Sequence, residues 1–319
     1  MRNLGLNKGL VLSAVVALVL TACGSERDTG DDGVTVVATT TILGDLAANL
    51  VGDDGVVEVI MPVGADPHDF QASSAQVAAI SRADLVVANG LGLEEGLEDV
   101  LDAAVADGVT VLQVAPLLDP IPFSVEHDEE GEIHDEEGES HDHEGDDPHV
   151  WLDPLRMGDA ARFVARELQA IDATADWMAR ADAYSAELAA LDADVVQMLS
   201  PIPPDRRRLV TNHGALGYFA DRYDFVIVDT VIPAASALAD PSSEELAELI
   251  AVMETEQLNV IFADTTMSSE LAEAMAAELG EAVEVVLLYT GSLDEPGSGA
   301  DTLIGMLRAN AERSAVALN

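Results

Sequence analysis

Cysteine, lysine and aromatic residues are scarce in this sequence: its 319 residues include one cysteine, and aromatic side chains make up 4%. A single cysteine excludes an intrachain disulfide, a Cys-rich zinc finger and an iron–sulfur centre. Few aromatics argue against a groove that stacks bases or sugars. A net charge of −46 makes nucleic acid and anionic membrane surfaces poor partners, because like charges repel. The 49% of hydrophobic residues still suffices for the core of one or two domains.

The first 23 residues are typical of a bacterial export signal. Arg2 and Lys8 precede an apolar run over residues 10–20 that is too short for a comfortable membrane span. The sequence Leu-Thr-Ala-Cys-Gly at 20–24 resembles the lipobox of bacterial lipoproteins, in which the cysteine is acylated after cleavage. We therefore predict a signal peptide at 1–22, a lipid anchor at Cys23 and a flexible tether at 23–33, with the protein extracytoplasmic. The alternative is an ordinary secretory signal with an incidental cysteine.

Short β-branched runs alternate with helical patterns in both halves of the remaining chain. In the first half, strands are predicted at 34–39, 56–61, 84–89 and 109–114, and helices at 42–51, 74–81 and 93–106. In the second half, strands are predicted at 208–211, 225–229, 259–263 and 283–288, and helices at 216–223, 243–256, 268–279 and 301–318. This alternation indicates βαβ units and parallel sheets. The expected fold class is α/β, with two (β/α)4-like lobes.

A helical region at 153–204 separates the two lobes, which we place at 34–152 and 205–319. Asp153 followed by Pro154 is a good helix start, and apolar residues then recur every three or four positions. Thr174 is the expected cap of a second helix over 174–200, which the prolines after Ser200 end. A helix of that length would join the lobes as a rigid linker; a coiled-coil segment is the less favoured alternative.

The chain has seven histidines, and four of them lie in an acidic segment at 126–147. That segment consists almost entirely of Asp, Glu, Gly and His, so it cannot bury apolar surface and is predicted to be a loosely ordered loop. Its histidines are candidate accessory metal ligands: His127, His134, His141 and His143.

The other three histidines follow short polar stretches near predicted strand ends. His68 lies in Gly-Ala-Asp-Pro-His-Asp-Phe, His149 in Asp-Pro-His-Val-Trp-Leu-Asp-Pro, and His213 in Thr-Asn-His-Gly-Ala-Leu-Gly-Tyr. Open α/β sheets bind ligands at the carboxyl ends of their strands. Three imidazoles that converge there suit a divalent cation such as Zn²⁺, whereas Ca²⁺ and Mg²⁺ prefer oxygen. Taken alone, each histidine would usually be a surface residue or a helix cap.

The sequence resembles the solute-binding proteins of zinc and manganese ABC transporters, the cluster A-I group of the ZnuA and TroA types. The resemblance rests on these three motifs and on two others, Val-Ile-Phe-Ala-Asp at 260–264 and Leu-Arg-Ala-Asn at 307–310. The resemblance covers residues 34–318. It implies two lobes joined by a long rigid helix, with the metal between them and His68, His149 and His213 as ligands. Manganese-type members place a carboxylate at the third position, so His213 favours a zinc-type member. The acidic His-rich loop is also a zinc-type feature.

One position departs from the family pattern. Many members carry an Asp as the fourth ligand in a turn near the C-terminus, and Gly291 occupies that position here. Asp294, three residues later, is our candidate replacement; water or a loop histidine are the alternatives.

We therefore expect a monomeric binding protein, not an enzyme, that captures Zn²⁺ and delivers it to an ABC permease with its ATPase. Release would follow protonation of the histidines or a rearrangement on docking. The alternatives are a zinc-dependent hydrolase or lyase with a three-His site, an adhesin or metal-buffering lipoprotein on the same fold, and manganese as the metal.

Overall fold

The computed structural model describes residues 33–123, 145–231, 243–279 and 283–319. The predicted signal peptide, Cys23 and all but the last residue of the tether lie outside these ranges, as do the four loop histidines (His127, His134, His141 and His143). Residues 32–319 belong to one compact unit. No helix in the described part of the chain combines the length and apolar character needed to cross a membrane.

The first lobe is built on a parallel sheet with strand order β2-β1-β3-β4. Its strands are β1 (Val34–Ala38), β2 (Gly55–Val59), β3 (Leu85–Ala88) and β4 (Thr110–Gln113). Its helices are α1 (Thr41–Val51), α2 (Ser74–Ile80) and α3 (Glu98–Ala106). In the register, Val36 lies opposite Val57 on one side and Leu85 on the other.

The second lobe repeats the same strand order as β6-β5-β7-β8, again parallel. Its strands are β5 (Arg208–Thr211), β6 (Val226–Thr230), β7 (Val260–Asp264) and β8 (Glu284–Leu288). Its helices are α6 (Gly217–Tyr223), α7 (Ser243–Glu256), α8 (Glu270–Leu279) and α9 (Leu303–Leu318). The predicted fold of two parallel-sheet lobes is confirmed, and each predicted strand is present within two residues of its expected ends.

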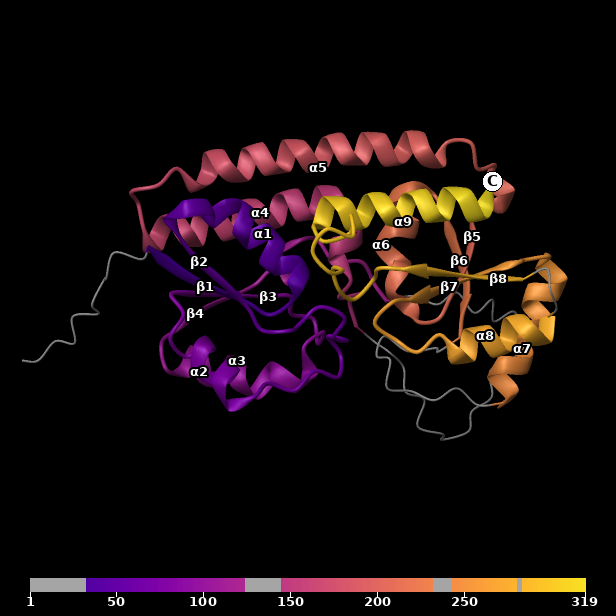
Figure 1. The fold of residues 1–319 in the computed structure, drawn as a ribbon, viewed down its shortest axis with the longest axis horizontal. Helices are drawn as coiled ribbons and strands as arrows, with labels where there is room; N and C mark the ends of the chain where they lie inside the picture. The colour runs from indigo at the N-terminus through magenta and orange to yellow at the C-terminus, as the bar shows by residue number, and fades with distance from the viewer. Residues whose placement is uncertain (1–32, 124–144, 232–242, 280–282) are drawn as a thin grey trace, which may run out of the picture. The chain divides into compact units, whose positions relative to one another are not determined.

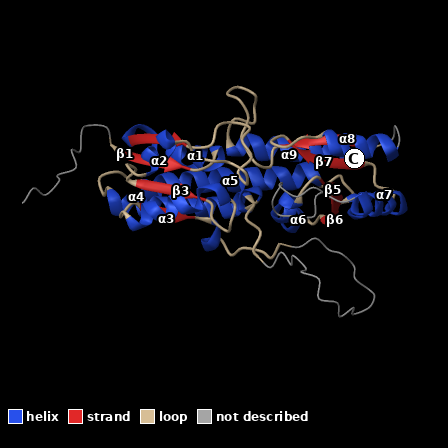
Figure 2. Cartoon of the chain, turned by 90° about the horizontal axis from the view of Figure 1, so that it is seen from below, coloured by secondary structure: helices blue, strands red, loops and turns tan. Residues whose placement is uncertain are grey.

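Each sheet is buried on both faces, which explains the nearly continuous apolar strands. Successive side chains of a strand point to opposite faces. Val36 and Ala38 accordingly join a core cluster shared with α1, α4 and α5, whereas Val37 joins another with residues of α2 and α3. In β7, Phe262 faces the shared core and Ile261 faces α7 and α8. Figure 2 shows the helices flanking the strands of each sheet.

Two helices connect the lobes, α4 (Pro154–Ile171) and α5 (Trp177–Leu199). Asp153 caps α4 as predicted, accepting a hydrogen bond from the backbone N–H of Leu155 at 2.8 Å. The expected cap of the second helix is wrong. Asp176 accepts from the N–H of Ala179 at 3.2 Å and starts α5, whereas the Thr174 hydroxyl donates to Asp172.

The helix α5 packs on α4 and contacts both α1 of the first lobe and α9 of the second (Figure 1). Its 23 residues span about 35 Å at 1.5 Å per residue. A partly buried carboxylate ties the three helices together, because Asp45 Oδ2 on α1 accepts from the Tyr184 hydroxyl of α5 and from the Leu303 N–H of α9, both at 3.0 Å. Both lobes are thus anchored to one continuous core.

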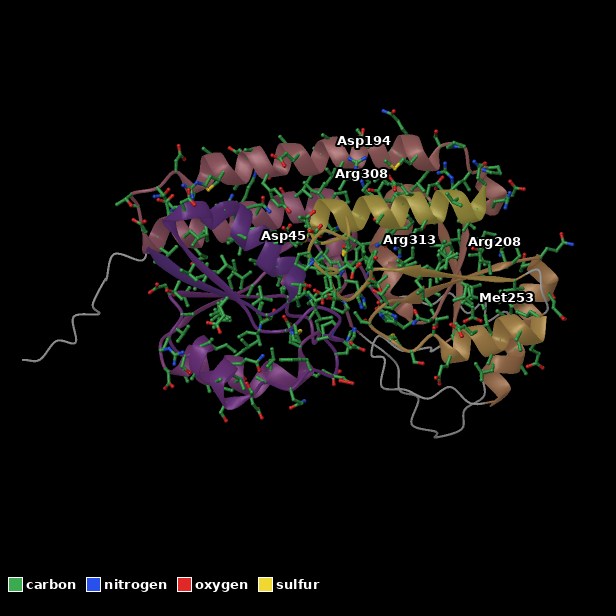
Figure 3. The ribbon with its side chains drawn as sticks, viewed as in Figure 1. Asp45, Asp194, Arg208, Met253, Arg308 and Arg313 are labelled. Carbon is green, nitrogen blue, oxygen red and sulfur yellow. The ribbon has the colours of Figure 1, made fainter. Side chains whose placement is uncertain are left out.

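Two arginine–aspartate pairs attach α5 to the second lobe, and they differ in burial. Arg222 donates two hydrogen bonds to Asp192, at 2.9 and 2.6 Å, and the side chain of Asp192 is 12% exposed. Arg308 pairs with Asp194 at 2.9 Å, where the side chains are 38% and 50% exposed (Figure 3).

We expect Asp192→Ala to lower the free energy of unfolding by about 2 kcal/mol, because it leaves a partly buried guanidinium unpaired. Asp194→Ala is the matched control on the same helix and should cost less than about 1 kcal/mol, as exposed pairs do. Urea denaturation with an unchanged m-value measures both. Equal losses in the two variants would contradict the prediction.

Candidate metal centre

The structure brings three histidines from distant parts of the sequence together. His68 lies in the segment after β2, His149 precedes α4, and His213 follows β5 by two residues. The Nε2 atoms of His68 and His149 are 3.3 Å apart, and one ring nitrogen of each of the three histidines lies within 4.8 Å of the others. Three nitrogen donors at this spacing can surround one cation, because a Zn–N bond is about 2.0–2.1 Å long.

The three imidazoles are buried, with relative exposures of 4%, 1% and 4% in chain order. Burial, reinforced by the neighbouring imidazoles, lowers the pKa of His68 to about 2. Burial also lowers the pKa of His213 to about 4, against an opposing effect of the Asp264 carboxylate. Both rings are therefore neutral at physiological pH, which is the form that binds metal ions.

The repeated Asp-Pro-His sequence forms the same local turn twice. Asp66 Oδ1 accepts the backbone N–H of His68 at 2.9 Å, and Asp147 Oδ1 accepts that of His149 at 2.9 Å. An aspartate two residues before a hydrogen-bonded N–H is a common turn device. The spacing was visible in the sequence, but we assigned Asp147 to the loop at 126–147 and missed its role.

Asp147 also orients the ring of His149. Its Oδ1 lies 2.7 Å from His149 Nδ1, and the carboxylate is 2% exposed. Nδ1 therefore carries the proton, and Nε2 is left with its lone pair facing the other imidazoles. The backbone of Asp147 is held in turn, because its carbonyl accepts a hydrogen bond from the Tyr218 hydroxyl at 2.7 Å.

His213 is positioned by the ends of β5 and β7. Asn212 donates its backbone N–H to the Phe262 carbonyl at 2.8 Å. The side-chain Oδ1 of Asn212 lies 3.3 Å from His213 Nδ1 and accepts the backbone N–H of Asp264 at 3.1 Å. The third imidazole therefore depends on the pairing of two central strands of the second sheet.

The turn at 290–293 joins the second lobe to the first beside the histidines. Trp151 donates its indole N–H to the Thr290 carbonyl at 2.7 Å. The Thr41 hydroxyl accepts the N–H of Leu293 at 2.9 Å, and the N–H of Gly64 donates to the Ser292 hydroxyl at 3.0 Å. Gly291 is thus fixed in place from both sides.

The structure does not place Asp294 with the imidazoles. Its Oδ2 accepts a hydrogen bond from the Tyr289 hydroxyl, and its Oδ1 accepts the N–H of Glu295, both at 2.8 Å. Arg313 stacks on the Tyr289 ring at 4.4 Å and donates to its hydroxyl. These contacts hold the Asp294 carboxylate with Tyr289 and Arg313, so the turn is not rearranged in the way that the candidate ligand required.

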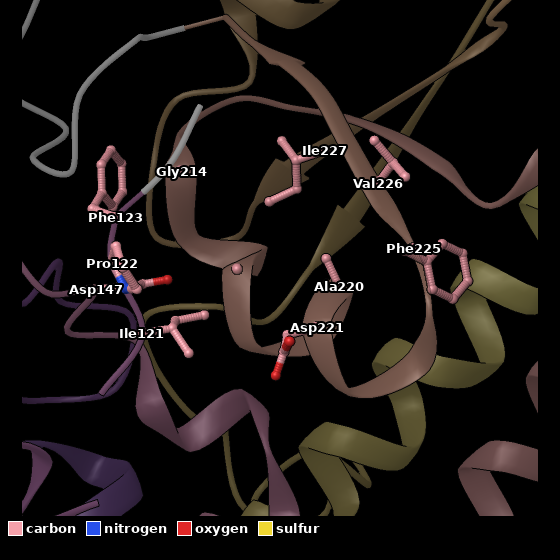
Figure 4. A pocket seen from close by; sticks show the side chains of 11 residues that line it. Ile121, Pro122, Phe123, Asp147, Gly214, Ala220, Asp221, Phe225, Val226 and Ile227 are labelled. Atoms are coloured by element: carbon pink, nitrogen blue, oxygen red, sulfur yellow. The ribbon is translucent and has the colours of Figure 1, made fainter. Parts of the chain in front are cut away.

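A separate pocket of about 460 Å³ adjoins this centre (Figure 4). None of the three imidazoles lines it, so it is distinct from the histidine cluster. Two residues of its wall adjoin the cluster: Asp147 contacts His149, and Gly214 follows His213 in the sequence. Phe123 packs closely over Gly214, the residue after His213.

Residues 36–317 match the family model described as the zinc-uptake complex component A, periplasmic. The match covers nearly the whole chain. The chain belongs to this family. Its members are substrate-binding components of ABC metal transporters, so the chain is a transport protein and not an enzyme.

Similar proteins differ in the metal that their names carry. The manganese-binding lipoprotein MntA of Halalkalibacterium halodurans is 28% identical over 93% of this chain and 94% of its own. The iron-binding protein YfeA of Yersinia pestis is 29% identical over 92% and 90%. Among solved structures, the periplasmic zinc-binding protein TroA of Treponema pallidum superposes with a TM-score of 0.77 at 27% identity, covering 90% of this chain and 99% of TroA. Membership of the family therefore does not select one metal.

The contact between Asp147 and His149 predicts a measurable contribution to metal affinity. Asp147→Ala removes the acceptor that fixes the tautomer of His149, so zinc affinity should fall about 10- to 100-fold. Asp147→Asn keeps a carbonyl acceptor and should lose less. Competition with a chromophoric chelator measures the affinities, and Asp146→Ala, an exposed neighbour, is the control. A wild-type affinity in Asp147→Ala would contradict this role.

Proposed function

We propose that this chain captures a Zn²⁺ ion between its two lobes and delivers it to an ABC permease, whose ATPase drives import. The observation that carries the proposal is the cluster of three buried imidazoles. A closed, nitrogen-rich site suits a cation that binds imidazole well, and its burial at the junction of the lobes suits transient sequestration of a cargo.

The donor set supports zinc over manganese. Within the described residues, the cluster of candidate ligands comprises His68, His149 and His213, so nitrogen donors outnumber any single carboxylate that joins them. Imidazole suits zinc, copper, iron and nickel, whereas Mn²⁺ prefers sites richer in oxygen. His213 is the position that distinguishes the two, because manganese-type members of this family resemble the present sequence but place a carboxylate there.

The location of the protein follows from its leader. In our proposal, acylation of Cys23 anchors a monomeric protein outside the cytoplasm, and the tether lets the lobes reach the permease. The loop histidines capture zinc weakly, while the surrounding acids attract the cation electrostatically. These roles rest on sequence, since both segments lie outside the described residues.

Release is better explained by docking than by acid. The lowered pKa values of His68 and His213, about 2 and about 4, mean that protons compete for these rings only far below neutral pH. A docking partner that separates the turn at 290–293 from Trp151 and Thr41 would instead open the cluster where the lobes are joined.

Competition titration of the purified protein with Zn²⁺ and Mn²⁺ tests the proposal. We expect one tight zinc site that is lost in His149→Ala. His213→Glu should weaken zinc binding at least about tenfold and reduce the preference for zinc over manganese, because an oxygen replaces a nitrogen donor.

A deletion of residues 126–144, which spares Asp147, is the matched control and should remove weak sites while keeping the tight one. A wild-type protein that binds Mn²⁺ as well as Zn²⁺ at equal free concentrations would contradict zinc selectivity. Absence of any tight site would contradict metal capture itself.

A further inference from the structure

Gly291 faces a space that other side chains fill. A Cβ atom built on Gly291 would lie 2.8 Å from Thr266 Oγ1, 3.3 Å from Asp264 Oδ2 and 3.3 Å from Pro67 Cδ. Pro67 precedes His68, so the space lies between the first histidine turn and the end of β7. A side chain at position 291 would press on the Thr266 hydroxyl. Asp264, at the end of β7, and Thr266, just after it, occupy the space that a side chain at position 291 would need.

Asp264 brings a buried carboxylate into this space. It is the last residue of β7 and is 2% exposed. Its Oδ1 accepts the N–H of Thr266 at 2.8 Å. Its Oδ2, the oxygen nearest to Gly291, accepts no hydrogen bond from any residue that the structure describes. A carboxylate on so buried a residue is costly unless donors or a cation satisfy it.

The backbone of Asp264 is connected directly to the third histidine. The N–H of Asp264 donates to Asn212 Oδ1, the same atom that lies 3.3 Å from His213 Nδ1. The electrostatic effect of Asp264 also opposes the lowering of the pKa of His213, which places its charge near that ring. Asp264 is therefore attached to the second-lobe side of the histidine cluster, and its Oδ2 lies by the same Cβ position of Gly291 that Pro67 of the first lobe approaches.

We propose that Asp264 supplies the carboxylate ligand of the metal centre from the end of β7, in place of the side chain that Gly291 lacks. The proposal rests on the proposed function, metal capture by the three histidines. Three imidazoles and one carboxylate complete a four-coordinate set, and the carboxylate offsets one of the two positive charges of the ion in a buried site. Asp294, held by Tyr289, is not needed in this arrangement.

The test compares Asp264→Asn with Asp294→Asn in the purified protein, with Zn²⁺ and then Mn²⁺ titrated against a competing chelator. Both variants remove one negative charge from the same lobe. We expect Asp264→Asn to weaken zinc binding at least about tenfold and manganese binding more, since Mn²⁺ depends more on carboxylate oxygen. Asp294→Asn should bind both ions as the wild type does.

A rescue variant separates ligation from a general loss of structure. Adding Thr266→Ala and Gly291→Asp to Asp264→Asn removes the obstructing hydroxyl and restores a carboxylate from the neighbouring turn. This triple variant should recover most of the lost zinc affinity. If Asp264→Asn does not fold, Asp264→Ser takes its place, because a serine hydroxyl can still accept the Thr266 N–H.

The outcomes distinguish the two proposals. If the wild type binds zinc tightly, His149→Ala loses that binding and Asp264→Asn keeps it, then metal capture stands and the assignment of Asp264 as a ligand is wrong. Weakening in Asp294→Asn but not in Asp264→Asn would overturn it in favour of Asp294. If the wild type itself binds neither ion, metal capture fails, and the role of Asp264 fails with it.

Discussion

Three imidazoles in one buried cluster are the constraint on which the rest of this structure depends. Each ring is almost fully buried, and burial lowers the pKa of His68 and His213 so that these two rings stay neutral. A neutral imidazole carries one N–H and one lone pair, so facing ring nitrogens cannot all be satisfied by one another. A divalent cation can accept the lone pairs that remain. The site is therefore organised for a ligand that the fold itself does not provide.

The fold supplies this organisation through rigid supports. Two parallel sheets of identical strand order direct the carboxyl ends of their strands toward the cluster, and α5 runs along both lobes. Asp147 fixes the tautomer of His149, and Asn212 links His213 to the end of β7. The turn at 290–293 is bonded to the first lobe at three points. The contacts that join the two lobes therefore lie beside the residues that would hold the metal.

Periodicity in the sequence predicted the fold well, because strands buried on both faces are nearly continuous apolar runs and the long helices repeat every three or four residues. The three histidines were predicted from their polar settings and from family resemblance. The supporting residues were missed for physical reasons. Asp147 follows a segment rich in acidic residues, so the sequence did not distinguish its buried carboxylate from the acids before it. Asp264 ends an apolar strand, and only tertiary packing reveals that it faces Gly291. Asp294 is close in sequence to the expected ligand position, but hydrogen bonds hold it with Tyr289.

The most direct test of a cation held between the two lobes is anomalous diffraction at the zinc absorption edge from crystals of the zinc-loaded protein. Our account predicts one strong peak within about 2.0–2.1 Å of a ring nitrogen of each of His68, His149 and His213. The absence of a peak among these three rings, or a fully occupied peak bound by other residues, would contradict the account.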